Sequence, residues 1–385
     1  MKCVRCGHDS NFKDRPGKKC PKCEGVFAFE PRNGDPFTDP AFQNAIDAVS
    51  AKGQVRFGAE HLYYELARRQ RPKTGCAVSA LIFFSIITLI ALVKVKWLAI
   101  IPLMVTIALA RSVWRAKQRK FIQLDQKLFD SMLRDWTKAH GQPKGLIVRA
   151  MTRGTPAPAP RQRETDIADY SFDRAVICDR ARTADVLLAN NFHFENNCAV
   201  LAVDGYPEAQ FETVRAMLKR NPRLKVFALH DATVKGCRLA YTLAHDPAWF
   251  AGQVDVTDVG LHPGQARAFR GLFQPQKIAA TAGGGVSTSD AAWLSAQSVE
   301  LAAIRPEQVL KRLYKALNKK ETDSDSSGDG GGGGGGGGSD SDRSGNVGYS
   351  GGGGTSGGSG SSVSYDDTSF THEAGDIDGD SDGFG

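Results

Sequence analysis

Four cysteines near the N-terminus stand in two pairs whose spacing suits a metal ion. Cys3 and Cys6 form one CxxC pair, and Cys20 and Cys23 form a second pair further along the chain. Thiolate sulfur is a soft ligand, and four such ligands suit a tetrahedral Zn²⁺ ion. The surrounding stretch has almost no apolar core of its own, so the ion would be needed for folding. Disulfides are the alternative, and the cytoplasmic placement argued below counts against them.

The cysteine segment resembles the zinc-ribbon family over residues 1–30. CVRC is followed by Gly and CPKC by Glu-Gly, as in the two tight knuckles of that family. The resemblance implies a small domain built around a structural zinc ion. Its cations are Lys2, Arg5, Lys13, Arg15, Lys18 and Lys19. A basic surface of this kind suits nucleic acid or acidic lipid headgroups, while a structural or protein-docking ribbon fits the same residues equally well.

A second set of candidate residues consists of acids that follow expected strands. From Phe172 to about Leu317, short β-rich apolar runs alternate with helical stretches, which predicts a parallel α/β sheet. Ligands of such sheets bind at the carboxyl ends of the strands. The acids at the four expected strand ends are Asp179, Asp204, Asp231 and Asp258. The first three could hold a weakly bound Mg²⁺ or Mn²⁺ ion, or they could serve turns and helix caps.

Part of this segment resembles the Toprim domain, in the version found in the A subunit of topoisomerase VI and the related meiotic double-strand-break proteins. The resemblance rests on VFALHDATVKGCRLAYTLA and VTDVGLHPGQ and covers about 145 residues. The family has an acidic residue after its first strand, D-x-D-x-x-G after the third and G-L-x-P after the fourth. The matching positions are Asp179 in place of Glu, Asp231 and Gly236 at the ends of the second element, and Gly260, Leu261 and Pro263. The resemblance implies that Asp179 and Asp231, together with Asp204, are the candidate catalytic residues. It implies binding roles for Gly236, Gly260 and Pro263.

The departures from the Toprim pattern concern the metal site. Thr233 replaces the second Asp of the D-x-D-x-x-G element. This change removes a carboxylate from a magnesium site that relies on one or two of them. No winged-helix segment with a nucleophilic tyrosine is evident in the sequence. The resemblance therefore implies a Toprim-like domain that has lost cleavage activity.

Two apolar runs must position these modules. Residues 75–93 carry no charge and, at about 1.5 Å per residue, would reach about 28 Å, close to the hydrocarbon thickness of a bilayer. Residues 97–110 would reach about 21 Å and would span only with help from Lys96 and Arg111. The sequence therefore predicts a helical transmembrane hairpin over 75–110, with a re-entrant hairpin as the alternative.

The charges beside these runs predict an orientation. Cations cluster before the first run and after the second, against only Lys94 and Lys96 between them. The positive-inside rule then places both termini in the cytoplasm of a multi-pass protein of the cell membrane. A helix is expected to continue from the second run to about Ala139, with an apolar stripe over 111–139. That stripe could pair with another copy in a homo-oligomer or pack on the protein's own domains.

Composition completes the division of the chain. The segments predicted are a zinc ribbon at 1–30, a helical juxtamembrane segment at 31–74, the hairpin at 75–110, an amphipathic helix and connector at 111–153, a Pro-rich linker at 154–164, the α/β Toprim-like domain at 165–320 and a tail at 321–385. The tail consists mainly of Gly, Ser and Asp, and it holds 13 of the 42 acidic residues but only one of the 49 basic ones. Such a composition cannot bury enough apolar surface to fold, so the tail is expected to be disordered.

Two classes of function fit these features. The first is a membrane-anchored, non-catalytic adaptor that binds a cytoplasmic protein, a nucleic acid or a nucleotide, with the lipid bilayer as a further partner. The second is a metal-dependent phosphoryl-transfer enzyme or nuclease that uses Asp179 and Asp231. Loss of the second acid of the D-x-D-x-x-G element favours the adaptor.

Overall fold

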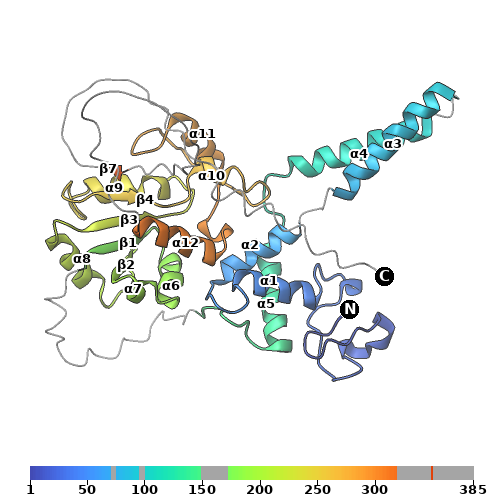
Figure 1. The fold of residues 1–385 in the computed structure, drawn as a ribbon, viewed down its shortest axis with the longest axis horizontal. Helices are drawn as coiled ribbons and strands as arrows, with labels where there is room; N and C mark the ends of the chain where they lie inside the picture. The colour runs from blue at the N-terminus through green and yellow to red at the C-terminus, as the bar shows by residue number, and fades with distance from the viewer. Residues whose placement is uncertain (71–74, 95–99, 149–171, 319–347, 350–385) are drawn as a thin grey trace, which may run out of the picture. The chain divides into compact units, whose positions relative to one another are not determined.

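The computed structural model describes residues 1–70, 75–94, 100–148, 172–318 and 348–349 (Figure 1). The chain forms two compact units. The first unit contains Met1–Ile46, Leu62–Pro143 and Phe269–Pro275, and the second contains Asp47–His61, Lys144–Ala268 and Gln276–Gly385. The expected linker at 154–164 and nearly all of the tail at 321–385 lie outside the described residues.

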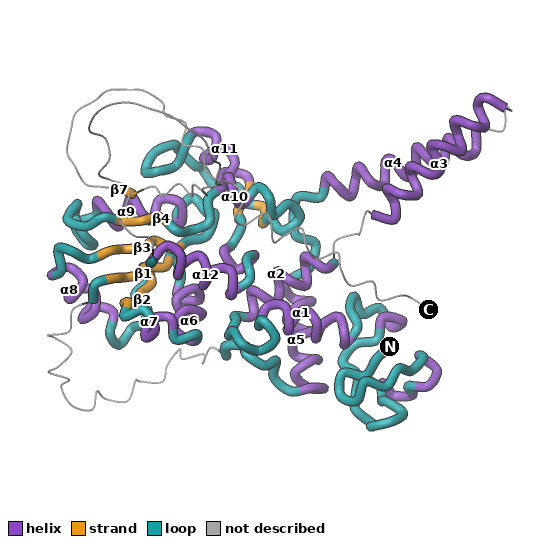
Figure 2. The backbone as a smooth tube through the Cα atoms, viewed as in Figure 1, coloured by secondary structure: helices purple, strands orange, loops and turns teal. Residues whose placement is uncertain are grey.

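Helices make up the regular structure of the N-terminal half (Figure 2). They are the short 3-10 turns η1 (Phe12–Asp14), η2 (Pro16–Lys18) and η3 (Pro31–Asn33) and the helices α1 (Asp39–Val49), α2 (Ala59–Arg69), α3 (Gly75–Lys94), α4 (Ile100–Gln118) and α5 (Gln126–His140). Gly141 ends α5 with a positive φ of 84°. That backbone conformation carries no steric penalty for glycine, so the helix stops there.

The cysteine segment is joined to α1 and α5 by an aromatic cluster. Phe42 stacks on Trp136 with ring centroids 4.8 Å apart, and Phe29 lies 5.1 Å from Phe42. Asp39 is fully buried and accepts hydrogen bonds from the backbone N–H of Phe29 at 2.8 Å and of Ala28 at 3.0 Å. These contacts bury the chain that leaves the second cysteine pair, so the ribbon shares a core with the two helices.

The expected transmembrane hairpin is wrong. Helices α3 and α4 do form and pack against each other, but no helix among the described residues has the length and apolar character needed to cross a bilayer. In α4 the apolar stretch 100–110 rises about 16 Å, short of the roughly 30 Å of a hydrocarbon core, and Arg111 and Arg115 follow it in the same helix.

The helix expected to continue from the second apolar run to Ala139 is interrupted. Helix α4 ends at Gln118 and α5 begins at Gln126. Between them, Phe121 pairs with Phe273, and the carbonyl of Lys120 accepts a hydrogen bond from Gly271 N at 2.9 Å. This pairing with residues 271–273 takes the place of helical hydrogen bonds. The apolar stripe of α5, including Phe129, Met132 and Trp136, is buried within the first unit.

A five-stranded sheet forms the centre of the second unit. Its order is β2 (Cys198–Ala202), β1 (Arg174–Cys178), β3 (Lys225–Leu229), β4 (Val256–Asp258) and β7 (Gly348–Tyr349). The first four strands are parallel, with Val176 level with Val200 on one side and Phe227 on the other. Strand β7, from the segment predicted to be a tail, pairs antiparallel with β4.

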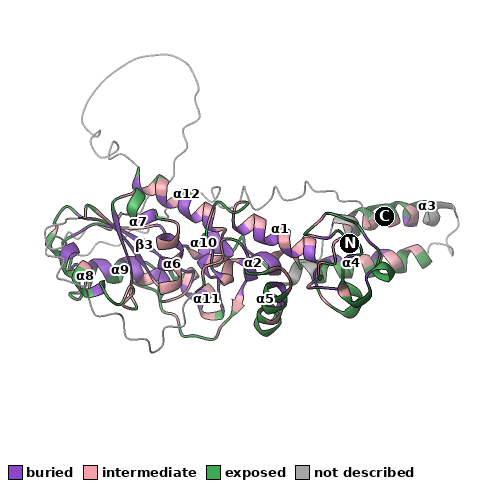
Figure 3. Cartoon of the chain, turned by 90° about the horizontal axis from the view of Figure 1, so that it is seen from below, coloured by how far each residue is buried: buried purple, intermediate pink, exposed green. Residues whose placement is uncertain are grey.

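Helices cover the sheet and give it a buried core (Figure 3). They are α6 (Ala181–Ala189), α7 (Phe192–Glu195), α8 (Phe211–Arg220), α9 (Leu239–His245), α10 (Pro263–Ala266), α11 (Thr288–Ala296) and α12 (Pro306–Leu317), with 3-10 turns η6 (Gly236–Arg238) and η7 (Leu301–Ala303). The short strands β5 (Gln274–Pro275) and β6 (Gln297–Ser298) fall in the first and second unit respectively. Ile177, Leu201 and Val226 are almost fully buried beneath Leu218 and Leu243. The predicted parallel α/β sheet is therefore present.

Candidate functional site

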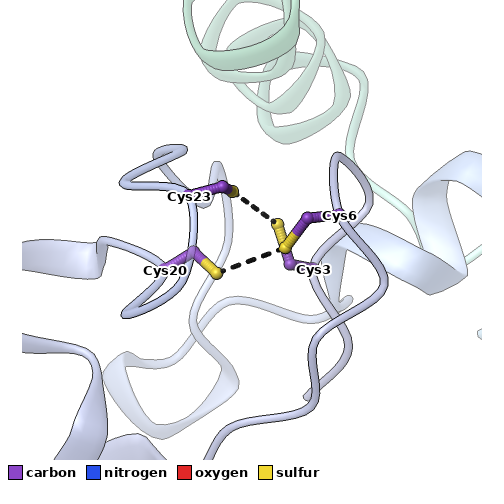
Figure 4. A group of neighbouring side chains, drawn as sticks. All are labelled: Cys3, Cys6, Cys20 and Cys23. Atoms are coloured by element: carbon purple, nitrogen blue, oxygen red, sulfur yellow. Dashed lines mark hydrogen bonds between the residues drawn. The ribbon is translucent and has the colours of Figure 1, made fainter.

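The four N-terminal cysteines converge on one point (Figure 4). Their sulfur atoms all lie within 4.8 Å of one another. Cys3 Sγ is 3.7 Å from Cys23 Sγ, and Cys6 Sγ is 3.6 Å from Cys20 Sγ. Four sulfurs at about 2.3 Å from a central zinc ion would be separated by about 3.8 Å in a tetrahedron, so these distances fit that ion. The cluster is the one that an N-terminal zinc ribbon requires.

The thiols themselves favour a cation at this point. Burial opposes ionisation of Cys20, but backbone N–H groups of Lys22 and Cys23 donate to its sulfur and lower its pKa to about 7. Gly25 N–H acts in the same direction on Cys23, yet the neighbouring sulfurs raise the pKa of Cys23 to about 12. Sulfurs this close to one another oppose one another's ionisation, and a dication placed among the four sulfurs would remove this opposition.

Not all the cations of the ribbon are available at its surface. Arg15 is buried in an ion pair with Glu30 at 3.1 Å, and its guanidinium lies over the Phe27 ring. Lys18 is paired with Asp35 at 3.4 Å. The exposed cations are Lys2, Arg5, Lys13, Lys19, Lys22 and Arg32. Arg32 lies over the ring of Phe12, which is itself exposed, so an aromatic group stands among the surface charges.

The candidate acids of the second unit lie at a topological switch point. From β1 the chain passes to β2 on one side, while β3 lies on the other side of β1. The carboxyl ends of such diverging strands form the usual ligand crevice of an open α/β sheet. Asp179 directly follows β1, and Asp231 is the second residue after the end of β3. The backbone N–H of Asp231 donates to Asp179 Oδ2 at 2.9 Å, so the two residues meet.

The carboxylate of Asp231 is engaged by the protein's own groups. Its Oδ1 accepts a hydrogen bond from Leu301 N at 2.6 Å. Its Oδ2 lies 2.8 Å from Arg180 Nε and 3.5 Å from Arg182 Nη2. Arg182 Nη2 also lies 2.7 Å from Glu300 Oε1. Two guanidinium groups and one peptide N–H therefore face a carboxylate that is almost fully buried, although burial still raises the pKa of Asp231 above its ordinary value.

A β-bridge outside the sheet, between Ala232 and Val299, places Glu300 and Leu301 over the strand ends. Ala232 N donates to the carbonyl of Val299 at 2.9 Å, and Val299 N donates back at 3.3 Å. This bridge fixes Glu300 and Leu301 beside Asp231 because they are the next residues in the chain. The crevice that the sheet topology would leave open is therefore closed by residues 299–301.

A cavity of about 20 Å³ remains beside Asp231, lined by Glu60, His61, Arg182, Leu301 and Val309 among others. This volume accommodates a single water molecule and is far too small for a nucleotide or sugar. His61 is half-buried there, and its Nδ1 atom is shielded from solvent and has no hydrogen-bond partner. Burial lowers the pKa of His61 to about 4, so the imidazole is neutral at physiological pH.

The remaining acid and the candidate glycines have local structural roles. Asp204 Oδ2 accepts a hydrogen bond from Ala181 N at 3.0 Å, at the first residue of α6. Asp179, Asp204 and Asp231 do not form a group with metal-ligand spacing among the described residues. A Cβ on Gly236 would lie 2.3 Å from the Asp231 carbonyl oxygen. Thr233 Oγ1 accepts from Gly236 N at 3.0 Å, so the turn that ends at Gly236 leaves no room for a side chain.

A histidine and aspartate pair beside this site escaped the sequence reasoning. His230 is fully buried, with Nε2 2.9 Å from Asp258 Oδ1 and Nδ1 2.9 Å from the Asp231 carbonyl. Both partners accept hydrogen bonds, so both ring nitrogens carry protons and the imidazole is charged. Burial would lower the pKa of His230, but the Asp258 carboxylate raises it well above its ordinary value. His262 adds a second ring nitrogen, 3.3 Å from the same Asp258 oxygen.

Two sequence features point to this group of residues: Asp258 ends a predicted strand, and Gly260 to Pro263 follow it directly. A Cβ on Gly260 would lie 2.2 Å from His230 Cδ2, so the glycine allows the backbone to approach the ring. Pro263 begins α10 and leaves His262 at the N-cap, in an extended conformation.

No protein-family model, curated protein or solved structure matches this chain. The likeness to the Toprim domain rests on the quoted residues alone.

Proposed function

We propose that this chain is a non-catalytic adaptor that combines a zinc-ribbon binding module with an α/β unit. The observation that supports it best is the engagement of the Asp231 carboxylate by Leu301 N–H, Arg180 and Arg182. A magnesium ion used for phosphoryl transfer needs carboxylate oxygens directed at the ion. Here positive groups of the chain occupy that position, and residues 299–301 cover the crevice.

The finer proposal is that the second unit descends from a Toprim-like domain and has lost its metal chemistry. The meeting of Asp179 and Asp231 at adjacent strand ends is in keeping with that origin. Thr233 departs from it, because its hydroxyl oxygen accepts from Gly236 N inside a turn. The alternative, a metal-dependent phosphoryl-transfer enzyme or nuclease, requires Asp231 to exchange its two arginines for an ion.

Magnesium binding separates these two functions. Calorimetric titration of Mg²⁺ into the full chain should show no saturable binding that depends on Asp179 or Asp231. Asp231→Asn and Asp179→Asn are the test variants, and Asp173→Asn is the matched control because Asp173 is exposed at the opposite end of β1. Binding that is lost in both test variants and kept in the control would favour the metal-dependent enzyme and count against the adaptor.

The binding module of the adaptor is the exposed cationic surface of the ribbon, and the partner we propose for it is a single-stranded nucleic acid. Lys2, Arg5, Lys13 and Lys19 supply phosphate contacts. Phe12, with Arg32 over its ring, offers a face on which a base can stack. A protein surface of acidic residues would use the cations but would have no need for the exposed ring.

Salt dependence and a stacking variant test this partner. Binding of a fluorescent oligonucleotide should weaken steeply with salt. The double variant Lys13→Gln and Lys19→Gln, which removes two positive charges, should reduce the slope of log affinity against log salt concentration by up to about 2. Phe12→Ala should weaken binding by about 1 to 3 kcal/mol through lost stacking. Val26→Ala, which removes another exposed apolar side chain of the ribbon, is the control. Affinity that is independent of salt would reject the proposal.

We also propose that the adaptor associates with a lipid surface through α3 and α4. Large apolar side chains are exposed on both helices, namely Ile82, Phe83, Ile86, Leu89, Ile90, Ile100, Ile101, Leu103, Met104 and Ile107. Soluble surfaces rarely carry so many neighbouring apolar groups. The hydroxyls of Ser85, Thr88 and Thr106 donate to carbonyls within their own helices at 2.7–2.8 Å. They therefore need no water, which suits an apolar environment.

Vesicle flotation tests the lipid association. The full chain should float with phosphatidylcholine vesicles, and Phe83→Glu with Leu89→Glu should abolish flotation. Leu128→Glu is the control, because Leu128 is an exposed apolar residue on α5 rather than on α3 or α4. A wild-type chain that stays at the bottom of the gradient would overturn this part of the proposal.

A further inference from the structure

Three potential metal ligands meet at the carboxyl ends of β3 and β4, away from the cysteine cluster. His230, Asp258 and His262 each offer one ligand atom, and these three atoms lie within 4.8 Å of one another. His230 is fully buried, Asp258 is nearly so, and the His262 side chain is 22% exposed. The group therefore has a buried base and one side that faces solvent.

The spacing of the three atoms matches a coordination sphere. His230 Nε2 is 2.9 Å and His262 Nε2 is 3.3 Å from Asp258 Oδ1. Ligands at about 2.1 Å from a common ion are separated by about 3.0 Å in octahedral and about 3.4 Å in tetrahedral geometry. The proton that His230 Nε2 shares with Asp258 occupies the place where an ion would bind. Loss of that proton on metal binding is the ordinary exchange at a histidine ligand.

Outer contacts already orient the ligands. Nδ1–H of His230 donates to the Asp231 carbonyl at 2.9 Å, which leaves Nε2 as the coordinating atom. Gly260 N–H donates at 3.0 Å to Asp258 Oδ1, the proposed ligand oxygen itself, and so fixes its position. The close packing of Gly260 on the imidazole holds the His230 ring in place. These supports are typical of a prepared metal site.

We propose that His230, Asp258 and His262 bind one divalent first-row transition metal ion, which joins the ends of β3 and β4 to the turn before α10. Two imidazoles and one carboxylate select such ions over Mg²⁺ and Ca²⁺, which prefer oxygen. A fourth position faces solvent beside His262. The ion is distinct from the zinc ion of the ribbon and from any magnesium at Asp179 and Asp231, so the inference goes beyond the proposed function.

One neighbouring charge opposes the ion and sets its expected strength. Arg312 Nη2 donates to the Gly260 carbonyl at 3.4 Å, and its guanidinium lies within electrostatic range of Asp258. Repulsion between that cation and a metal dication weakens binding. We therefore expect the ion in the second unit to leave at a lower chelator concentration than the ion of the cysteine cluster.

Cobalt titration of the full chain tests the site. We expect two Co²⁺ ions per chain, the cysteine cluster giving thiolate charge-transfer absorption and the second site giving only weak visible bands. His262→Ala should reduce the content to one ion and keep the charge-transfer band. His245→Ala is the control, since His245 lies in the same unit and its ring bonds to the Tyr241 carbonyl. Asp258→Asn, which preserves shape, should also reduce the content to one ion.

The second ion should also stabilise the second unit. Excess Zn²⁺ should raise the melting temperature of the wild-type chain and of His245→Ala more than that of His262→Ala, since an ion that binds only the folded state stabilises it. A wild-type chain that takes up one Co²⁺ ion would overturn the inference. Retention of two ions by both His262→Ala and Asp258→Asn would overturn it as well.

Discussion

The backbone N–H of Asp231 donates a hydrogen bond to Asp179 Oδ2 at 2.9 Å and so joins the ends of β1 and β3 through one carboxyl group. Burial, together with the negative charge of Asp231, raises the pKa of Asp179 to about 7. His230 and Arg180 oppose the shift without cancelling it. At neutral pH the folded chain therefore keeps a carboxyl group that holds a proton about half of the time.

This raised pKa predicts how stability changes with pH. The folded state binds the proton of Asp179 more tightly than the unfolded state, whose pKa is near 3.8. The contribution of Asp179 to the free energy of unfolding is therefore highest below about pH 4, falls as pH rises to about 7, and is constant above that. Asp179→Asn removes this loss and should stabilise the protein at pH 8 by on the order of 2 to 4 kcal/mol. Urea denaturation from pH 4 to 8 measures the effect.

His61 contributes a slope of the opposite sign over an overlapping range. Its pKa is about 4 in the fold against 6.5 unfolded, so its contribution to stability rises as pH increases from 4 to 6.5. Asp179→Asn should therefore show a steeper rise with pH than the wild type in this window. Asp173→Asn, which changes an exposed carboxylate, should reproduce the wild-type curve. Parallel curves for wild type and Asp179→Asn would contradict the raised pKa.

Gly260→Ala should destabilise the second unit by about 3 kcal/mol or more. The added Cβ would lie 2.2 Å from Cδ2 and 2.4 Å from Nε2 of a buried ring, so His230 would have to move away from Asp258. Gly264→Ala is a matched control in the neighbouring helix, where a Cβ meets nothing within 4 Å. Thermal unfolding by circular dichroism compares the two variants. Equal melting temperatures would show that the ring can shift at no cost.

The parallel sheet and the cysteine cluster could be predicted because both depend on local patterns. Alternating apolar runs indicate strands and helices, and CxxC spacing brings two thiols together in a single turn. The closure of the Asp231 site could not be predicted in this way, because Arg180 and Glu300 are separated by 120 residues and meet only through the fold. Asp258 and His230 are likewise brought together by strand order, which the sequence does not specify.

The transmembrane prediction failed for a different reason. Hydropathy detects an apolar run but does not show whether a helix able to cross a bilayer forms over it, and among the described residues no such helix is present. The expected continuation to Ala139 failed because Lys120 and Phe121 pair with residues 271–273, a contact of long range in sequence. Helical periodicity carries no information about such a partner.

Removal of the ribbon's metal should disturb the aromatic cluster of the first unit. Phe29 follows the second cysteine pair and lies 6.2 Å from Trp136 in a stacked arrangement. Without the ion the four thiolates repel, and a segment with so small a core unfolds. A chelator should therefore shift Trp136 emission to longer wavelength, and Trp136→Phe identifies the signal. Cys20→Ser should give the same shift without chelator, whereas Cys198→Ala should not.

Arg182→Met should be among the more destabilising substitutions in the second unit, at about 3 kcal/mol or more. The side chain lies 2.7 Å from Glu300 and 3.5 Å from Asp231, both largely buried, so its loss leaves two carboxylates with one arginine. Lys311→Met removes a cation from a pair with Glu307 in which both side chains are exposed, and should cost less than about 1 kcal/mol. Urea denaturation of both variants separates the two cases, and similar costs would mean that water reaches the Asp231 cluster. Arg182 also lies beside Asp231, where a catalytic magnesium ion would bind. If Arg182→Met binds Mg²⁺ more tightly than the wild type while it is less stable, then the arginines that close this site are what exclude the metal ion.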